Sequence, residues 1–268
     1  LDLVTTLPRL PGPGETLTAT GLTRIPGGKG ANQALAARRL GLPVQLVAAV
    51  GADPEASTAL ELLHREGVGL AGLQRVTEPT GLALVTVDAA GETTIVVVPG
   101  ANAALRVSAA DVAGAEVVLT VLEVPDQAVT AAARHAGGLF VLNASPARAL
   151  PPEVLQRADL VVVNKAEHAA LPDLHSARAV AVTDGPRGAV LLRRGTQVAA
   201  AAPPPVQTVD GTAAGDAFIG AAVASLLHGL PDAELLTRAC AAGALATTRS
   251  GAQPSLPTTA EIDEVLAR

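Results

Sequence analysis

The sequence lacks tryptophan, tyrosine and methionine, and its 268 residues include two aromatic side chains, Phe140 and Phe218. A site that binds its ligand by stacking on aromatic rings is therefore not expected, and aliphatic side chains must fill the core. Cysteine is equally scarce. Because Cys240 is the single cysteine, no intramolecular disulfide can form, and this use of cysteine favours a cytoplasmic protein.

Long apolar runs and excess positive charge are missing as well. Apolar residues make up 49% of the chain, yet no stretch reaches the roughly 18 unbroken apolar positions that a membrane helix needs. The formal net charge of −6 argues against a nucleic-acid partner, which requires a basic face. The length suits one large α/β domain over residues 1–268, or a domain with a small appendage.

The most informative stretch covers residues 209–220, Val-Asp-Gly-Thr-Ala-Ala-Gly-Asp-Ala-Phe-Ile-Gly. It predicts a turn of small residues that leads into an apolar helix over 217–227. Small side chains let a ligand approach the backbone, and the free N–H groups of the helix start can bind an anion. Asp216 would repel a phosphate bound directly against it, but it could act as a base for a hydroxyl group. The same residues could also form an ordinary turn with a capping aspartate.

A second glycine-rich stretch covers residues 26–33, Pro-Gly-Gly-Lys-Gly-Ala-Asn-Gln, and opens an alanine-rich helix that ends near Gly41. No serine or threonine follows Lys29, so this is not a Walker loop, and the Gly-x-Gly-x-x-Gly spacing of a dinucleotide-binding fold is absent. Taken alone, it is typical of a structural turn between a strand and a helix.

Together the two stretches resemble the signatures of the PfkB-type sugar kinases, the ribokinase family. Asp-x-Thr-Ala-Ala-Gly-Asp is similar to the second signature of that family, and Gly-Gly-Lys-Gly-Ala-Asn-Gln is similar to the first. They occur in the right order, about 180 residues apart. The resemblance implies that Asp216 is the catalytic base and that the backbone amides of Ala213, Ala214 and Gly215 form an anion hole for the transferred phosphate.

The resemblance also implies a set of sugar-binding residues. Gly28 would let the backbone touch the sugar, Asn32 offers both a donor and an acceptor to hydroxyl groups, and Lys29 would lie close to the phosphate charge. Glu123, after a strand over 117–122, is similar to the family glutamate that contacts sugar hydroxyls. Asp2 matches the last residue of an Asn-x-Asp pattern that usually ends the first strand of the family, although that strand and the Asn do not precede it.

The nucleotide and its metal ion have candidate residues in the second half of the chain. Asn164 and Glu167 match an Asn-x-x-Glu motif that organises Mg²⁺ through water. ATP-binding residues are implied by a Thr-x-Gly-x-x-Gly match and by the anion hole: Thr183, Gly185, Gly188 and Gly215, together with Asn164. Two features depart from the family pattern. The segment over 168–178 is short. Asp184 is an acid beside nucleotide phosphates, so it is expected to point away from them.

A last motif, Gly-Ala-Gln-Pro-Ser over 251–255, resembles the family loop that holds a monovalent cation. An oxygen-only site of this kind suits K⁺. The implied ligands are the Asp210 carboxylate, the Ser255 hydroxyl and the carbonyl groups of Thr212, Ala246, Arg249 and Gly251. The alternative is an ordinary C-terminal loop.

Strands and helices alternate in the second half, with strands over 117–122, 139–143, 160–163 and 179–183 and a helix over 127–135. This pattern predicts an α/β fold with a doubly wound, mostly parallel central sheet covered by helices. A hairpin over 81–98, turning at 88–92, is expected to join strands from 16–25 in a small β-sheet lid. Both hairpin faces are apolar, which favours a homodimer through the lid.

These observations predict an ATP-dependent sugar kinase that converts D-ribose to ribose 5-phosphate, with Mg²⁺ and with K⁺ as activator. The hydroxyl-binding set Asp2, Asn32 and Glu123 favours a plain pentose, as does the scarcity of aromatic residues for holding a base. Alternatives are a kinase of the same family for fructose, 2-keto-3-deoxygluconate or a nucleoside and, in a different class, a non-catalytic sugar-binding protein.

Overall fold

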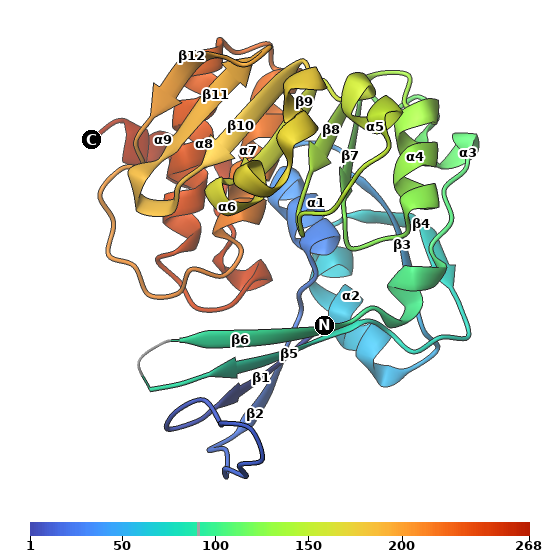
Figure 1. The fold of residues 1–268 in the computed structure, drawn as a ribbon, viewed down its shortest axis with the longest axis vertical. Coiled ribbons are helices and arrows are strands. Elements are labelled where there is room, and N and C mark those ends of the chain that lie inside the picture. Colours follow the sequence, from blue (N-terminus) through green and yellow to red (C-terminus); the bar gives the residue numbers. More distant parts are fainter. Residues whose placement is uncertain (90–91) are drawn as a thin grey trace.

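The computed structural model describes residues 1–89 and 92–268. A six-stranded sheet carries helices on both faces, and a four-stranded sheet projects from one end of this body (Figure 1). The strands are β1 (Asp2–Thr6), β2 (Leu22–Ile25), β3 (Gln45–Val50), β4 (Gly69–Arg75), β5 (Leu82–Val87), β6 (Thr93–Val98), β7 (Val117–Val121), β8 (Leu139–Asn143), β9 (Leu160–Asn164), β10 (Ala179–Thr183), β11 (Ala189–Arg193) and β12 (Thr196–Ala201). The helices are α1 (Lys29–Arg39), α2 (Pro54–Arg65), α3 (Ala109–Val112), α4 (Asp126–His135), α5 (Pro152–Arg157), α6 (Lys165–Ala170), α7 (Ala214–Leu227), α8 (Asp232–Ala246) and α9 (Thr259–Leu266).

The six-stranded sheet has the order β12-β11-β10-β9-β8-β7, and β7 to β10 run parallel. Its side chains alternate between two cores. Val141, Val162 and Ala181 pack against α1, α7 and α8, whereas Phe140 and Val161 pack against α4 and α5 on the opposite face. Both faces are therefore buried, which explains the nearly continuous apolar runs of these strands. The predicted fold class is confirmed, and the elements predicted between residues 117 and 183 end within one residue of their predicted bounds.

β3 and β4 form a separate parallel pair. A cavity of about 840 Å³ is lined by apolar residues of β3 and β7 and also by Lys29 and Glu123. The cavity therefore extends from two strand edges to residues that the sequence assigns to sugar binding.

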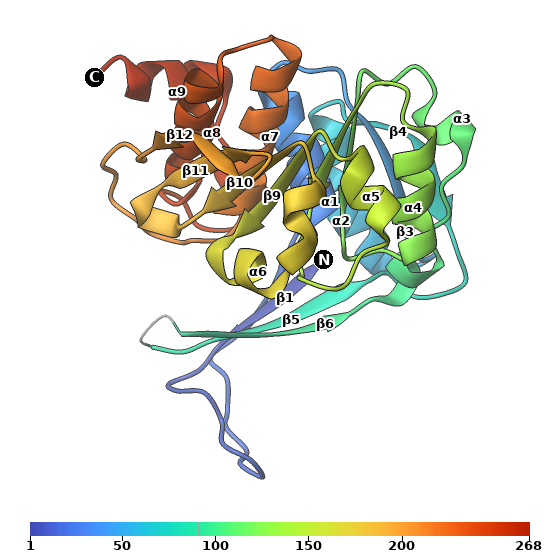
Figure 2. The same ribbon diagram turned by 45° about the horizontal axis from the view of Figure 1, so that its top comes forward.

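The smaller sheet has the order β2-β1-β5-β6 and corresponds to the predicted lid (Figure 2). The hairpin of β5 and β6 is confirmed, although residues 90–91 of its predicted turn lie outside the described residues. Lid strands were predicted from residues 16–25, and within this range Leu22–Ile25 form β2. β1 pairs with β2 from Asp2–Ile25 to Thr5–Leu22, and just before β2 Thr20 N donates to the carbonyl of Thr6, the last residue of β1, at 3.1 Å.

Asp2 lies in β1, which runs parallel to β5 in the lid. The next four residues, Leu-Val-Thr-Thr, include three β-branched side chains, which favour strands, and they have partner strands on both sides. Asp2 consequently lies where the lid sheet meets the main body.

Two helices cross closely at the centre of the molecule. α7 begins at Ala214, three residues before the predicted start at 217, so Gly215 and Asp216 lie in its first turn. A methyl group added to Gly220 would lie 2.6 Å from the Cβ of Ala36 in α1, which shows that only glycine permits this spacing of the helices. The close crossing brings the first turn of α1 to the first turn of α7.

Candidate active site

Asp216 is the centre of the candidate site, and it is 8% exposed. Its Oδ2 accepts a hydrogen bond of 2.9 Å from Asn32 Nδ2, and its Oδ1 accepts one of 2.8 Å from Gln33 Nε2. Burial raises the pKa of Asp216, while these two donors and the charge of Lys29 oppose that rise. A carboxylate with a raised pKa, held by two fixed donors, is suited to accept a proton from a hydroxyl group.

The turn before α7 has the backbone geometry of an anion site. Ala213, the residue at the N-cap, has φ of 61°, a left-handed conformation that costs energy for a residue with a side chain. Apart from its chain neighbours and the backbone of its own helix, no atom of the described residues lies within 4 Å of the position where a side chain on Gly215 would begin, which leaves space beside the first amides of the helix. Ala214 N donates to Gly211 O across 3.4 Å, a long bond that leaves this amide weakly held.

The predicted sugar-binding side chains lie together around Asp216. Lys29 Nζ is 3.7 Å from Glu123 Oε1, and the charges of this pair act on both Asp216 and Asp2. Burial raises the pKa of Asp2, whose carboxylate occupies the space where a side chain on residue 27 would be. Gly28 forms the N-cap of α1 with φ of 91°, a conformation for which glycine is needed. The structure thus brings α1, β1 and the segment after β7 to one place.

The predicted nucleotide-binding residues form a second group at the ends of neighbouring strands. Thr183 of β10 is the register partner of Asn164 in β9. Asn164 caps α6 by accepting from Glu167 N at 2.9 Å, and Glu167 Oε2 accepts from Asn164 N at 2.8 Å, which is a capping box. Gly188 has φ of 89°, and a side chain there would overlap the carbonyl of Ala201. Within the described residues, no hydrogen bond or ion pair joins this group to Asp216.

Two features near this group depart from the family pattern, Asp184 and the short segment over 168–178, and the structure describes both. Asp184 accepts hydrogen bonds from Arg187 and Lys165, and Arg187, followed by Lys165, lowers the pKa of this carboxyl to about 2. Its charge is therefore balanced by two cations, while its direction relative to nucleotide phosphates stays a prediction. The short segment forms α6, which ends at Ala170, and a 3-10 turn over Pro172–Ser176.

The loops predicted to bind K⁺ are tied together by one carboxylate. Asp210 accepts from Thr212 N, Thr212 Oγ1 and Gly251 N at 2.9, 2.6 and 2.8 Å. Burial would raise the pKa of Asp210, but these hydrogen bonds outweigh it and the pKa is lowered. Ser255 is fully buried and donates to Ala252 O at 2.8 Å. This arrangement places residues 210–212 beside residue 251.

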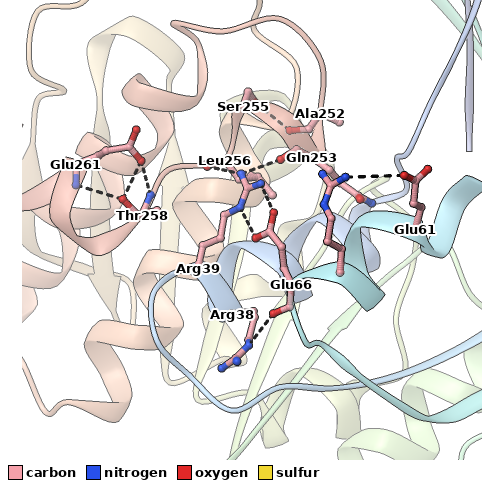
Figure 3. Close-up of polar contacts among 11 residues, drawn as sticks. Arg38, Arg39, Glu61, Glu66, Ala252, Gln253, Ser255, Leu256, Thr258 and Glu261 are labelled. Carbon is pink, nitrogen blue, oxygen red and sulfur yellow. Dashed lines mark hydrogen bonds and ion pairs between the residues drawn. The ribbon is translucent and has the colours of Figure 1, made fainter.

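Arg39, a residue that the motifs did not indicate, fastens the last of these loops to α1 (Figure 3). Its Nη1 donates to Gln253 O at 3.0 Å and to Leu256 O at 2.6 Å. Its Nε and Nη2 donate to the Glu66 carboxylate at 2.7 and 2.6 Å. The end of α1 therefore holds the loop over 253–256, while the start of the same helix holds Asp216.

Comparison with known proteins decides the family. The sequence profile described as pfkB family carbohydrate kinase matches residues 1–259. The chain belongs to this family. Ribokinase of Haemophilus influenzae is 34% identical over 291 aligned residues, which cover 99% of this chain and 95% of the relative. Ribokinase of Bacillus subtilis is also 34% identical, over 283 aligned residues that cover 100% of this chain and 96% of the relative.

Solved structures of pfkB relatives share the fold over the full chain. Ribokinase of Thermotoga maritima superposes with a TM-score of 0.91 at 29% identity, covering 100% of this chain and 96% of that one. Ribokinase of Arabidopsis thaliana, solved with ribose and ATP, gives a TM-score of 0.89 at 29% identity with the same coverage. The predicted family, fold class and enzyme class, a carbohydrate kinase, are confirmed. Among the described residues of this pfkB chain, no helix is long and apolar enough to cross a membrane.

Proposed function

We propose that this protein transfers the γ-phosphoryl group of ATP to D-ribose and releases ribose 5-phosphate and ADP. The observation that carries the proposal is the buried Asp216 carboxylate in the first turn of α7, held by Asn32 and Gln33. The relatives named ribokinase, and the Arabidopsis structure with ribose and ATP, support ribose as the acceptor. The single cysteine favours a cytoplasmic location.

In this mechanism, the primary hydroxyl of the sugar donates to Asp216 and loses its proton to that carboxylate. The hydroxyl oxygen forms a bond to the γ-phosphorus as the bond to the leaving oxygen of ADP breaks. Charge on the transferred group is stabilised by the amides of Ala213, Ala214 and Gly215, with Lys29 nearby. Positioning and fixed dipoles supply most of the rate enhancement in reactions of this type.

Substrate recognition is divided between two groups of residues. Asn32 Oδ1 is buried and has no partner within the described residues, so it is available to accept from a sugar hydroxyl. Asp2, Glu123 and the backbone at Gly28 would supply the remaining sugar contacts. The nucleotide would lie along the carboxyl ends of β9 and β10, the usual ligand edge of a parallel sheet, with contacts from Asn164, Thr183, Gly185, Gly188 and Gly215.

Divalent metal ions accompany ATP in kinases generally, and Mg²⁺ neutralises charge on the phosphates when bound. Glu167 fits an outer role, because Oε2 is held by the Asn164 amide and Oε1 can accept from a water molecule of the metal. Mg²⁺ usually keeps several of its waters, so a carboxylate outside the first coordination sphere suits it.

K⁺ is the proposed activator. The loops that Asp210 draws together offer the carbonyl groups of Thr212, Ala246, Arg249 and Gly251, with the Ser255 hydroxyl. Because Asp210 keeps its negative charge through a lowered pKa, the loops present both charge and neutral oxygens to a hard cation. Such an ion would fix the turn before α7 without contacting the sugar.

A homodimer through the lid is the proposed assembly. The lid exposes several large apolar side chains that a monomer would leave in water: Leu22, Leu84, Ile95, Val96, Val97 and Val98. Ile95 and Val97 are 58% and 53% exposed on one side of β6, and Val96 is 56% exposed on the other. Light scattering after size exclusion is expected to give twice the chain mass, and Ile95→Glu with Val97→Glu to reduce it to one. A strict monomer in the wild type would contradict the proposal.

The proposed reaction is tested by measuring ADP release from Mg-ATP with ribose, fructose, 2-keto-3-deoxygluconate or adenosine, each with and without K⁺. Turnover on ribose that rises with K⁺ is expected. Faster turnover on another acceptor would assign a different substrate within the family. Calorimetric binding of ribose without turnover on any acceptor would identify a sugar-binding protein instead.

A further inference from the structure

We propose that Gln33 is a positioning residue, which holds Oδ1 of Asp216 so that Oδ2 is directed at the substrate hydroxyl. The inference rests on the proposed function of Asp216 as the base. It goes beyond the sequence assignment, which placed Asn32 in the site and gave Gln33 no role.

Gln33 is fixed both by burial and by its contact with Asp216. It is 1% exposed, and its Nε2 donates to Asp216 Oδ1, so Gln33 acts on the reaction through the atom it touches. A buried amide is costly to retain without a hydrogen bond, and the 2.8 Å bond to Asp216 is the bond that its NH₂ group makes within the described residues.

Asn32 and Gln33 donate to different oxygens of the Asp216 carboxylate. A carboxylate oxygen has two lone pairs, so Oδ2 can accept from the substrate hydroxyl while Asn32 still donates to it. Asn32 has two proposed roles, because its Nδ2 donates to Asp216 and its Oδ1 is proposed to bind the sugar. The Nε2 of Gln33 donates to Asp216 Oδ1 and has no proposed sugar contact. With Oδ1 held, rotation of the carboxylate about its Cβ–Cγ bond is restricted, and Oδ2 keeps its direction.

The charge of Asp216 depends on the same bond. The groups that face this carboxylate are Asn32 and Gln33 from α1, Lys29 from the start of α1 and Glu123 from the segment after β7. Burial raises its pKa most, Glu123 adds to the rise, and the two amides and Lys29 lower it. Removing the Gln33 donor therefore raises the pKa further, so that more of the base is protonated at a given acidic pH.

The test uses Gln33→Met, which keeps a similar volume and removes the donor. We measure kcat, KM for ribose and the pH profile of kcat with Mg-ATP. We expect kcat to fall about 10- to 100-fold, because a hydrogen bond to a charged group is lost. KM for ribose should stay within about threefold. The acidic limb of the pH profile should move to higher pH. Leu35→Met, a fully buried neighbour in the same helix, is the matched control and should leave all three unchanged.

Gln33→Asn is a second variant, which retains the amide but is too short for the 2.8 Å contact, and it should show the same shift. A direct readout is the pH titration of the Asp216 carboxyl by carbon NMR, whose midpoint should rise in both variants. Unchanged kcat and an unchanged midpoint would overturn the proposal, as would an increase in KM alone. If the wild type phosphorylates no acceptor, the proposed function fails, whereas the NMR midpoint still tests the contact of Gln33 with Asp216.

Discussion

Asp216→Asn is expected to lower kcat by about 10²- to 10⁴-fold, the usual contribution of a general base. The substitution keeps the shape of the side chain and replaces the carboxylate by a neutral amide, which is too weak a base to take the proton. Measured with Mg-ATP and ribose, KM should change little, because the sugar contacts of Asp2, Asn32 and Glu123 remain. A loss in kcat with unchanged KM identifies an interaction made in the transition state.

The fold is expected to tolerate this substitution. Gln33 Oε1 has no partner within the described residues, so rotation of this amide would offer an acceptor to the new NH₂ group. A buried charge is removed at the same time, which favours the folded state. The midpoint of thermal unfolding should therefore not fall. A variant that keeps near-normal turnover would show that Asp216 is not the base.

The pH profile provides an independent part of this prediction. A base must be ionised, so the rate of the wild type falls as the pH drops through the pKa of Asp216. Because burial raises that pKa, the acidic limb should lie above the ordinary value of an aspartate, about 3.9. In Asp216→Asn this limb should be absent from the residual rate.

The sequence predicted the parts of the site that depend on local pattern. The turn of small residues before an apolar helix indicated Asp216, and the glycine-rich turn before an alanine-rich helix indicated Asn32. It misplaced the start of α7 because Gly215 disfavours a helix. Packing against α8 favours a helix that begins at Ala214. Gly243 of α8 lies so close that a methyl group added to it would be 3.1 Å from Ala214 O.

Partners distant in the sequence could not be predicted in the same way. Gln33 and Asp216 are 183 residues apart, and Arg39 and Gln253 are 214 apart. A sequence shows that Gln33 is a polar residue in an apolar helix, which signals a buried partner, but it does not identify that partner. The lid strand shows the same limit, because β2 forms by pairing with β1, a distant partner that its own residues do not identify.

Arg39→Met is expected to lower the free energy of unfolding by about 2 to 3 kcal/mol, near the lower end for breaking a buried ion pair by removing one partner. The side chains of Arg39 and Glu66 are 15% and 26% exposed, so water compensates Glu66 only in part. The carbonyl groups of Gln253 and Leu256 also lose their donor. Chemical denaturation with an unchanged m-value would measure this loss.

The matched control is Arg65 of α2. Arg65 and Glu61 form an ion pair of 3.8 Å along α2, with side chains 68% and 69% exposed. An exposed pair of this kind contributes little, so Arg65→Met should change the free energy of unfolding by less than about 0.5 kcal/mol. Equal losses in the two variants would show that the Arg39 contacts have no special weight.

The effect of Arg39 should depend on pH in a defined direction. The hydrogen bond from Arg39 lowers the pKa of Glu66, so the pair stabilises the fold above the ordinary pKa of a glutamate, and this contribution disappears as the pH falls through the lowered value. The difference in stability between wild type and Arg39→Met should therefore be largest near neutral pH and smaller in acid. It should not vanish there, because Arg39 still donates to the two carbonyl groups of the loop over 253–256.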